Sequence, residues 1–166
     1  MRWLKWWWPV LLWGTCMSLF STGAFTADNT SHFILPFLRW LMPHASPETL
    51  ELGHYLIRKC AHFTEYFLFS LLVLRAFSAG RPGPNWKWTV WTVLVVVAYA
   101  SFDEFHQSFV PGRTALPTDV LIDSTGGFVA QVVAWVWMTW RNGRRARGLG
   151  GDAGAGANAT VEGLRD

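Results

Sequence analysis

The sequence predicts an all-α membrane protein: a bundle of four transmembrane helices with short loops, an interfacial segment on the outer side and a disordered C-terminal tail. Hydrophobic residues make up 51% of the 166-residue chain and charged residues only 15%, against about 25% charged residues in soluble domains. The apolar residues gather in long runs, each of a length suited to crossing a bilayer. The net charge of +3 does not indicate a nucleic-acid partner, because the basic residues flank these runs, where they set membrane orientation.

The first predicted span covers about residues 6–24. Arg2 and Lys5 precede it, and tryptophans crowd its start, a combination typical of the cytoplasmic membrane interface. A cleaved signal peptide is the alternative interpretation, because the segment ends in small residues. The bulky stretch WWWP fits the apolar region of a signal peptide poorly, and we therefore favour a retained span.

A connecting segment, residues 25–57, follows the first span. Its stretch HFILPFLRWLM is amphipathic enough to lie in the membrane interface. Ser46 is a suitable helix N-cap, Pro47 suits the first helical position and Glu48 suits the first turn. We expect the helix that begins here to run straight into the second span, about residues 57–77.

Two further spans complete the predicted bundle. Residues 78–86 are rich in Gly and Pro and predict a turn. The third span is expected at about residues 88–107 and the fourth at about 118–140. Residues 141–166 are first basic and then Gly- and Ala-rich, too poor in large apolar side chains to pack. The chain is thus predicted to be one membrane domain, residues 1–140, followed by this tail.

The basic residues fall on one side of a four-span topology. They precede the first span, surround the loop between the second and third spans, and follow the fourth span: Arg2, Lys5, Arg75, Arg81, Lys87, Arg141, Arg144, Arg145 and Arg147. The positive-inside rule makes that side cytoplasmic, so both termini are expected in the cytoplasm.

Polar side chains gather at the opposite, outer end of the predicted spans, where charge within a bilayer is costly and indicates function. Lys59, His62 and Glu65 step by three along the second span, and Tyr66 lies four residues after His62, so these side chains form one stripe. The other members come from the end of the third span, the next loop and the start of the fourth span: Asp103, Glu104, Gln107, Arg113, Asp119 and Asp123. We expect these groups to form one site below the outer membrane surface.

The residue types suggest two kinds of role within this site. Carboxyl and imidazole groups suited to acid–base catalysis are supplied by His62, Glu65, Asp103, Glu104 and Asp119. Substrate binding is assigned to Lys59, Tyr66, Gln107, Arg113 and Asp123. Of these, Lys59 and Arg113 are cations that recognise phosphate oxygens, and Arg does so as a bidentate fork. The carboxylates are also suitable oxygen ligands for Mg²⁺, although no metal ligand set is assigned.

A structural interpretation stands beside the functional one. Arg58 and Lys59 have side chains long enough to reach the interface from a helix end, and Asp119 suits the start of a helix. Pairs such as Lys59–Asp119 or His62–Glu65 would simply hold the bundle together. Below the acidic pair of the fourth span lies a face of small residues, Gly126, Gly127 and Ala130, which lets a partner helix approach closely. A homodimer through this face is one such arrangement.

Other site classes lack their sequence patterns. Cys16 and Cys60 have no metal-ligand spacing and predict neither a disulfide nor a zinc site. The sequence has no His-Glu-x-x-His motif and no phosphate-binding Gly loop after a strand.

The blocks RKCAHFTEYFLF and SFDEFHQSFVPGRTALPTDVLIDSTGG resemble the VanZ-like family of small bacterial membrane proteins. The resemblance covers about residues 55–140. It places Lys59, His62, Glu65 and Tyr66 in a first motif, and the third-span, loop and fourth-span residues in two further motifs that end at Gly126. Many members of the family have Asn where this chain has Asp123. The resemblance implies a four-helix protein of the bacterial cytoplasmic membrane and a link to resistance to teicoplanin-type glycopeptides.

Three functions remain open at this point. The first is an enzyme that acts on an anionic lipid headgroup or a lipid-linked cell-wall precursor at the outer leaflet. The second is a module that binds or shields such a headgroup without chemistry. The third is a proton-linked transporter, since His and Glu within a membrane relay protons. Against transport, the inner halves of the spans, such as AWVWMTW, offer no ionisable group to continue a relay.

Overall fold

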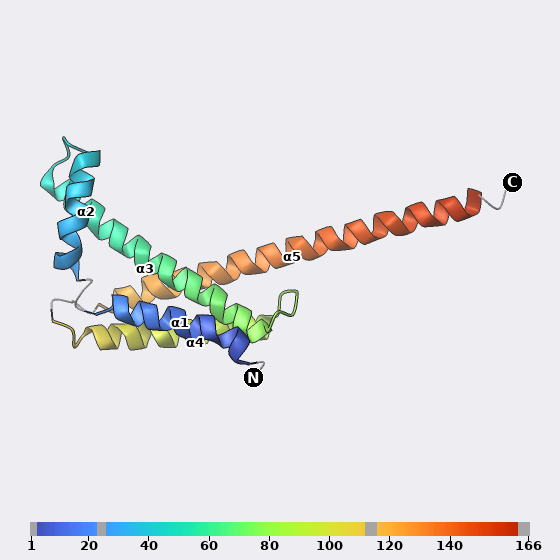
Figure 1. Cartoon of the computed structure of the whole chain (residues 1–166), viewed down its shortest axis with the longest axis horizontal. Helices are drawn as coiled ribbons and strands as arrows, with labels where there is room; N and C mark the ends of the chain where they lie inside the picture. The colour runs from blue at the N-terminus through green and yellow to red at the C-terminus, as the bar shows by residue number, and fades with distance from the viewer. Residues whose placement is uncertain (1–2, 23–25, 112–115, 163–166) are drawn as a thin grey trace.

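Figure 1 shows the computed structural model of the chain, which describes residues 3–22, 26–111 and 116–162. This part of the chain forms five helices and no strand, so the all-α prediction is confirmed. The helices are α1 (Leu4–Phe20), α2 (Ala27–Leu41), α3 (Pro47–Ser78), α4 (Trp86–Gln107) and α5 (Pro117–Glu162).

The helix starts follow from local capping. The hydroxyl of Ser46 accepts a hydrogen bond from the Thr49 amide at 3.3 Å, and Pro47 occupies the first turn of α3, as predicted. Thr26 and Asn85 cap α2 and α4 in the same way, which satisfies amide groups that a helix start leaves without partners. The prediction that the segment from Ser46 continues into the second span is also confirmed, since α3 is one uninterrupted helix of 32 residues.

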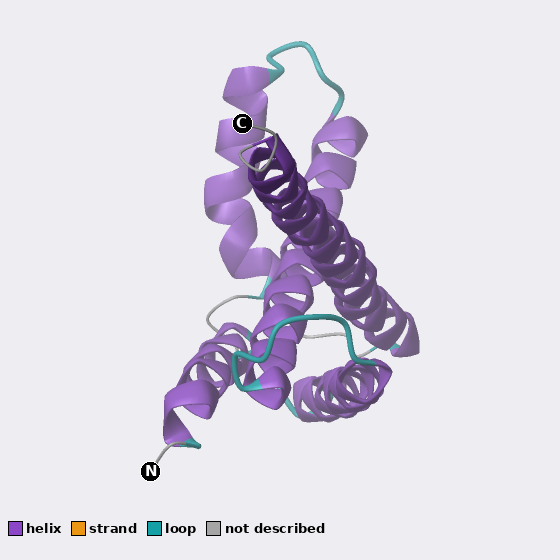
Figure 2. Ribbon diagram, turned by 90° about the vertical axis from the view of Figure 1, so that its right-hand side faces the viewer, coloured by secondary structure: helices purple, strands orange, loops and turns teal. Residues whose placement is uncertain are grey.

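Helix α3 is the centre of the fold and contacts each of the other four helices. Helices α1, α4 and α5 pack along its C-terminal part, whereas α2 lies beside its N-terminal part, away from the other helices (Figures 1 and 2). The buried core between α1, α3 and α4 includes Met17, Tyr66, Phe69, Val73 and Val96.

The small-residue face of α5 packs against α3 and α4. Gly126 approaches the backbone of Phe63 on α3 so closely that a Cβ at this position would collide with the Phe63 carbonyl oxygen, and Gly127 lies against the side chain of Val96 on α4. The predicted close approach beneath the acidic pair is therefore confirmed, and its partners are two helices of the same chain.

Three helices are long and apolar enough to cross a membrane: Pro47–Ser78, Trp86–Gln107 and the part of α5 from Pro117 to Arg145. The predicted count of four is not established by these criteria, because α1 has 17 residues. At a rise of 1.5 Å per residue it extends about 26 Å, somewhat less than the ~30 Å hydrocarbon thickness of a bilayer.

The C-terminal stretch differs from the prediction. The sequence predicted a disordered tail over residues 141–166, but α5 continues without a break to Glu162 and projects away from the other helices (Figure 1). Adding residues to an existing helix avoids the costly nucleation step, and the Ala and Arg residues of this stretch favour a helix, although its glycines do not. A helix can therefore extend where the sequence is too polar to pack.

Candidate functional site

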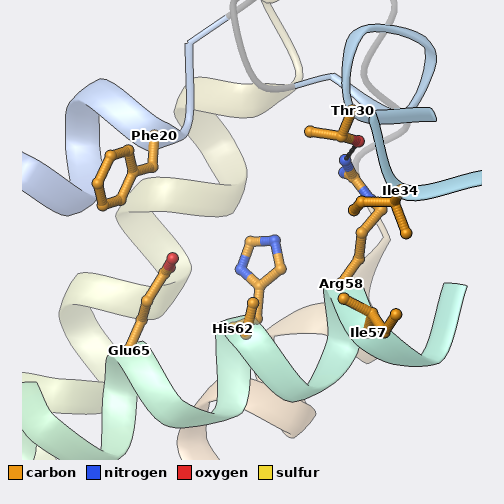
Figure 3. A pocket seen from close by; sticks show the side chains of 8 residues that line it. Phe20, Thr30, Ile34, Ile57, Arg58, His62 and Glu65 are labelled. Atoms are coloured by element: carbon orange, nitrogen blue, oxygen red, sulfur yellow. Dashed lines mark hydrogen bonds between the residues drawn. The ribbon is translucent and has the colours of Figure 1, made fainter. Parts of the chain in front are cut away.

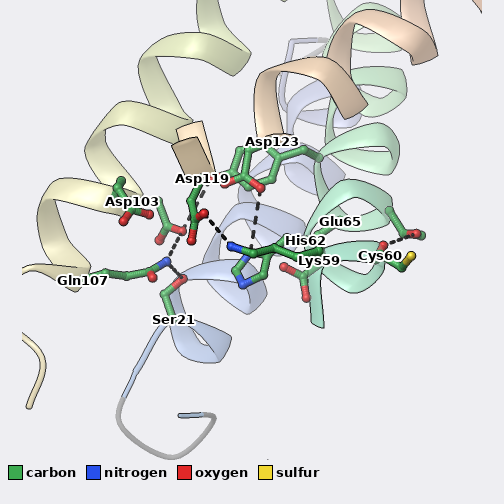
Figure 4. A network of polar contacts seen from close by, with 12 residues as sticks. Ser21, Lys59, Cys60, His62, Glu65, Asp103, Gln107, Asp119 and Asp123 are labelled. Carbon is green, nitrogen blue, oxygen red and sulfur yellow. Dashed lines mark hydrogen bonds and ion pairs between the residues drawn. The ribbon is translucent and has the colours of Figure 1, made fainter. Parts of the chain in front are cut away.

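Polar side chains from four helices meet at one end of the bundle, close to where α1 and α4 end and α5 begins (Figure 4). They form several short chains of contacts that each join two or three helices. Of the ten predicted site residues, Arg113 lies outside the described residues; the other nine lie at this end of the bundle.

Lys59 and Asp119 form an ion pair between α3 and the first turn of α5. The Lys59 Nζ lies 2.5 Å from the Asp119 Oδ1, and the two side chains are only 18% and 22% exposed. The same ammonium group lies 5.2 Å from the centre of the Tyr55 ring, a favourable cation–π distance. This pair was one of the two structural pairings that the sequence suggested, and the structure contains it.

His62 reaches from α3 to Asp123, one turn deeper on α5. The His62 Nδ1 lies 3.8 Å from the Asp123 Oδ1, within ion-pair range but too long for a hydrogen bond. The Asp123 residue is 2% exposed, and among the described residues its Oδ1 has no hydrogen-bond partner. A buried oxygen without a donor is costly, which makes this atom the least satisfied acceptor of the cluster.

Asp103 is bound from two sides in the interior. Its Oδ2 accepts hydrogen bonds from the Gln107 Nε2 at 2.8 Å and from the Tyr66 hydroxyl at 3.4 Å. The Gln107 Nε2 also donates to the Ser21 hydroxyl, at 3.3 Å, at the end of α1. All four residues are at least 95% buried, so this chain of contacts couples α1, α3 and α4.

Glu104 holds the start of α5. Its Oε1 accepts a hydrogen bond from the Leu116 amide at 2.5 Å, and the residue is 8% exposed. A carboxylate that accepts from a backbone amide fixes the position of that backbone. The geometry therefore gives Glu104 a positioning role beside Asp119, which lies three residues after Leu116.

A cavity of about 280 Å³ adjoins this cluster, between the end of α1, α2 and the middle of α3 (Figure 3). Its walls are mainly apolar and include Phe20, Ile34 and Ile57, while His62 and Glu65 point into it from α3. His62 thus lines the cavity and also faces the buried Asp123, which connects the cavity to the interior of the site.

Helix α2 forms one wall of this cavity and is held against α3 by hydrogen bonds. The Arg58 Nη1 donates to the Thr30 hydroxyl at 3.0 Å (Figure 3), and the His54 Nε2 lies 3.2 Å from the same oxygen. The sequence interpretation gave Arg58 a simple interfacial position, but the structure uses it to hold α2 against α3.

Several contributors to this end of the bundle were missed from the sequence. Ser21 and Thr30 are ordinary hydroxyl residues near helix ends, and their only signal was the absence of an apolar side chain. A further buried chain lies deeper, where the Gln131 Nε2 donates to the Ser70 hydroxyl at 2.8 Å and that hydroxyl donates to the Gly127 carbonyl at 2.9 Å. These deeper polar groups are not ionisable at neutral pH.

The described residues contain no group of three or more His, Cys, Asp or Glu side chains arranged to hold a metal ion. The carboxylate of Asp119 accepts from Lys59, that of Glu104 from the Leu116 amide, and that of Asp103 from Gln107 and Tyr66. The groups beside the apolar cavity are the His62 imidazole and the Glu65 carboxyl, with the buried Asp123 behind His62.

The helices and this cluster define an all-helical membrane protein with a buried polar site at one end of its bundle. Residues 3–139 match the model of the VanZ/LLP1 family, which covers more than half of the chain, and the chain belongs to that family. The resemblance read from the sequence motifs is thereby confirmed. No curated protein and no solved structure matches the chain.

Proposed function

We propose that this is a multi-pass protein of the bacterial cytoplasmic membrane whose polar site at the outer face binds and acts on an anionic lipid or the headgroup of a lipid-linked cell-wall precursor. The observation that carries the proposal is the buried Asp123 Oδ1, which has no hydrogen-bond donor among the described residues and lies 3.8 Å from the His62 Nδ1. His62 in turn lines the apolar cavity. The proposal includes the link to glycopeptide resistance that the family resemblance implies.

The lining of the cavity supports an amphiphilic ligand. A volume of about 280 Å³ is near the lower limit of small-molecule pockets, about 300–1,000 Å³, and suits part of a lipid. Phe20, Ile34 and Ile57 offer contacts to an alkyl chain, while His62 and Glu65 offer contacts to the polar group next to it. A ligand that enters from the outer leaflet would present both parts at once.

His62 is the residue best placed for chemistry. It is 23% exposed, so its ring remains accessible from the cavity while Asp123 faces its other side. Imidazole is the usual general acid or base near neutral pH, and the Asp123 Oδ1 lies 3.8 Å from its Nδ1. A hydroxyl or phosphate oxygen of a ligand in the cavity would lie within reach of this group.

A fourth membrane span is part of the proposal, and the packing of α1 supports it. The Trp13 indole donates to the Glu65 carbonyl at 3.1 Å, and the Tyr99 hydroxyl donates to the Gly14 carbonyl at 2.6 Å. Near its start, Trp6 contacts Gly80 at the other end of α3. Helix α1 therefore extends along α3 from Glu65 to its end at Ser78 and to Gly80 in the loop that follows. We infer that it crosses the membrane with its neighbours, leaving both termini in the cytoplasm.

The second candidate is a binding or shielding module at the same site. It is favoured by the engagement of Asp103, Glu104 and Asp119 in contacts that hold helices in place, which leaves His62, Glu65 and Asp123 as the groups for chemistry. Transport is supported least, because the buried polar groups deeper in the bundle, Ser70 and Gln131, carry no titratable proton.

The test is His62→Gln, with His106→Gln as the matched control. His106 is an exposed histidine at the C-terminal end of α4, at the same end of the bundle as His62. Lipids and cell-wall precursors from bacteria that produce the wild type or either variant are compared by mass spectrometry. Loss of a general acid or base lowers a rate by about 10²–10⁴-fold, so a headgroup change made by the wild type should disappear with His62→Gln and persist with His106→Gln.

Other outcomes separate the two candidates. If no headgroup changes but a lipid copurifies with the wild type and is lost with His62→Gln, the protein is a binding module. If both variants match the wild type in lipid content and in glycopeptide susceptibility, the assignment of function to this site is wrong. Equal membrane levels of the three proteins are required for the comparison.

A further inference from the structure

A second cavity lies at the opposite end of the bundle. It has a volume of about 460 Å³ and is enclosed by the last turns of α3, the loop between α3 and α4, the start of α4, and α5 near residue 140. Four arginines are among its lining residues: Arg75, Arg81, Arg141 and Arg145. The guanidinium of Arg75 also lies 5.0 Å from the ring centre of Trp6 on α1, which is not part of the lining. We call this cavity the arginine pocket.

The charge of this pocket is not balanced by its own lining. None of the lining residues that the structure describes is acidic, so four positive charges share one cavity. Such a concentration of like charge costs electrostatic energy and attracts an anion of matching size.

Two of the four arginines, Arg81 and Arg141, lie over indole rings that also line the pocket. Arg81 lies 5.1 Å from the ring centre of Trp88, and Arg141 lies 5.1 Å from that of Trp137. A guanidinium stacked on a ring can still donate in its own plane, as the Arg81 Nε does to the Ser78 carbonyl, and its terminal N–H groups have the fork geometry that recognises phosphate oxygens.

The loop that carries Arg81 has a fixed shape. Ala79, Gly80 and Gly83 have positive φ angles of 47°, 76° and 99°, and the Arg81 Nε donates to the Ser78 carbonyl at 3.2 Å. A Cβ at Gly83 would lie 3.3 Å from the Asn142 amide nitrogen, so the loop packs directly onto α5. This packing brings the loop that carries Arg81 next to the part of α5 that carries Arg141 and Asn142.

The interior wall of the pocket is apolar. Leu71, Leu74 and Met138 line it, each within about one helical turn of Arg75 or Arg141 in the sequence. The pocket thus combines phosphate-binding groups with a hydrophobic wall. It is also lined by two tryptophans, a residue that is enriched at membrane–water interfaces.

We propose that the arginine pocket binds the phosphodiester headgroup of an anionic lipid from the leaflet opposite the candidate functional site. The apolar wall favours a lipid over free phosphate, since it would pack against acyl chains and gives a small inorganic ion nothing to contact. Basic pockets between membrane helices are known to bind anionic headgroups. This site is separate from His62 and does not depend on the function proposed above.

The test uses the full-length protein in detergent and native mass spectrometry with added dioleoyl phosphatidylglycerol or dioleoyl phosphatidylcholine. The pocket variant is Arg81→Gln with Arg141→Gln. The control is Arg144→Gln, since Arg144 is also exposed, also lies over a tryptophan ring and is three residues from Arg141 on α5, but does not line the pocket. His62→Gln serves as a second control.

The wild type should retain phosphatidylglycerol in preference to phosphatidylcholine. The pocket variant should lose this retention by about tenfold or more, because two charge-assisted contacts are removed. Arg144→Gln and His62→Gln should behave as the wild type. Retention of phosphatidylglycerol by a His62→Gln protein that has lost its activity would separate the two sites.

Three results would overturn the proposal. One is equal retention of the two lipids by the wild type. Another is an equal effect of Arg144→Gln and the pocket variant, which would reduce the finding to general attraction between basic residues and acidic lipids. The third is displacement of bound phosphatidylglycerol by an equimolar amount of inorganic phosphate, which would identify the site as one for the free ion.

Discussion

Asp103 and Asp123 are both buried carboxylates, yet their surroundings differ. Asp103 receives two hydrogen bonds, from Gln107 and Tyr66, whereas the Asp123 Oδ1 has only His62 as an ion-pair partner at 3.8 Å. A satisfied buried carboxylate stabilises a fold, and an unsatisfied one is retained at a cost. Asp103 therefore contributes to holding α3 and α4 together, whereas the Asp123 Oδ1 gains no hydrogen bond from the described residues.

Gly126 is the residue at which packing leaves least freedom. A Cβ there would collide with the carbonyl oxygen of Phe63, and a backbone atom cannot move aside as a side chain does. Gly126→Ala should destabilise the protein by about 1–3 kcal/mol, the usual cost of overpacking, and lower its Tm in detergent.

Gly143→Ala is the control for this substitution. A Cβ at Gly143 has no atom within 4 Å, and Ala is favoured over Gly in a helix by about 0.8–1.0 kcal/mol. This variant should therefore unfold at the same or a higher temperature. An equal decrease in Tm for both variants would show that the Phe63 contact is not the cause.

At the scale of the helices, the sequence predicted which residues share a face and suggested the Lys59–Asp119 pair, which the structure contains, but not most of the other contacts between helices. The three-residue spacing of Lys59, His62 and Glu65 placed them on one stripe of α3. Spacing within one helix carries no information about its neighbour, so the pairing of His62 with Asp123 was not predicted. The contacts made by Ser21 and Thr30 were missed for the same reason, because a hydroxyl gains its role only from the tertiary structure.

Helix α2 offers a test of one such contact. The Thr30 hydroxyl accepts from Arg58 and lies 3.2 Å from His54, and it joins α2 to α3 above the cavity. Thr30→Val keeps the shape and removes this oxygen. At a net value of about 0.5–1.5 kcal/mol for a hydrogen bond, its loss should speed hydrogen exchange of the α2 amides by up to about tenfold, while α4 should be unaffected.

Ser31→Ala is the matched variant for α2. The Ser31 hydroxyl donates only to the Asp28 carbonyl within the same helix in the contacts that the structure gives it. Its removal should leave the position of α2 unchanged. If Ser31→Ala and Thr30→Val speed exchange equally, the effect comes from the stability of α2 itself and not from its attachment to α3.

For the whole molecule, the sequence predicted the helical class and the positions of the long apolar helices, because a long run of apolar residues is visible in the sequence without knowledge of the tertiary contacts. The end of α5 was not predicted, since its helix arises by continuation from the membrane-spanning part and not from packing. The number of spans lies between these cases. Helix α1, with 17 residues, is shorter than the three helices that are long enough to cross a membrane. Its contacts with α3 nevertheless extend over the length that we infer for a span.

Labelling of single cysteines in intact cells decides the number of spans. In a background with Cys16→Ala and Cys60→Ala, one cysteine is introduced at a time by Trp3→Cys before α1, His44→Cys between α2 and α3, or Pro82→Cys between α3 and α4. All three positions are exposed. A membrane-impermeant maleimide should label His44→Cys in intact cells, and Pro82→Cys only after permeabilisation, because the basic flanks of the second loop favour the cytoplasm. With four spans, Trp3→Cys should behave as Pro82→Cys does. Labelling of Trp3→Cys in intact cells would show that α1 does not cross the membrane, and the inference drawn from its contacts with Glu65, Tyr99 and Gly80 would be wrong.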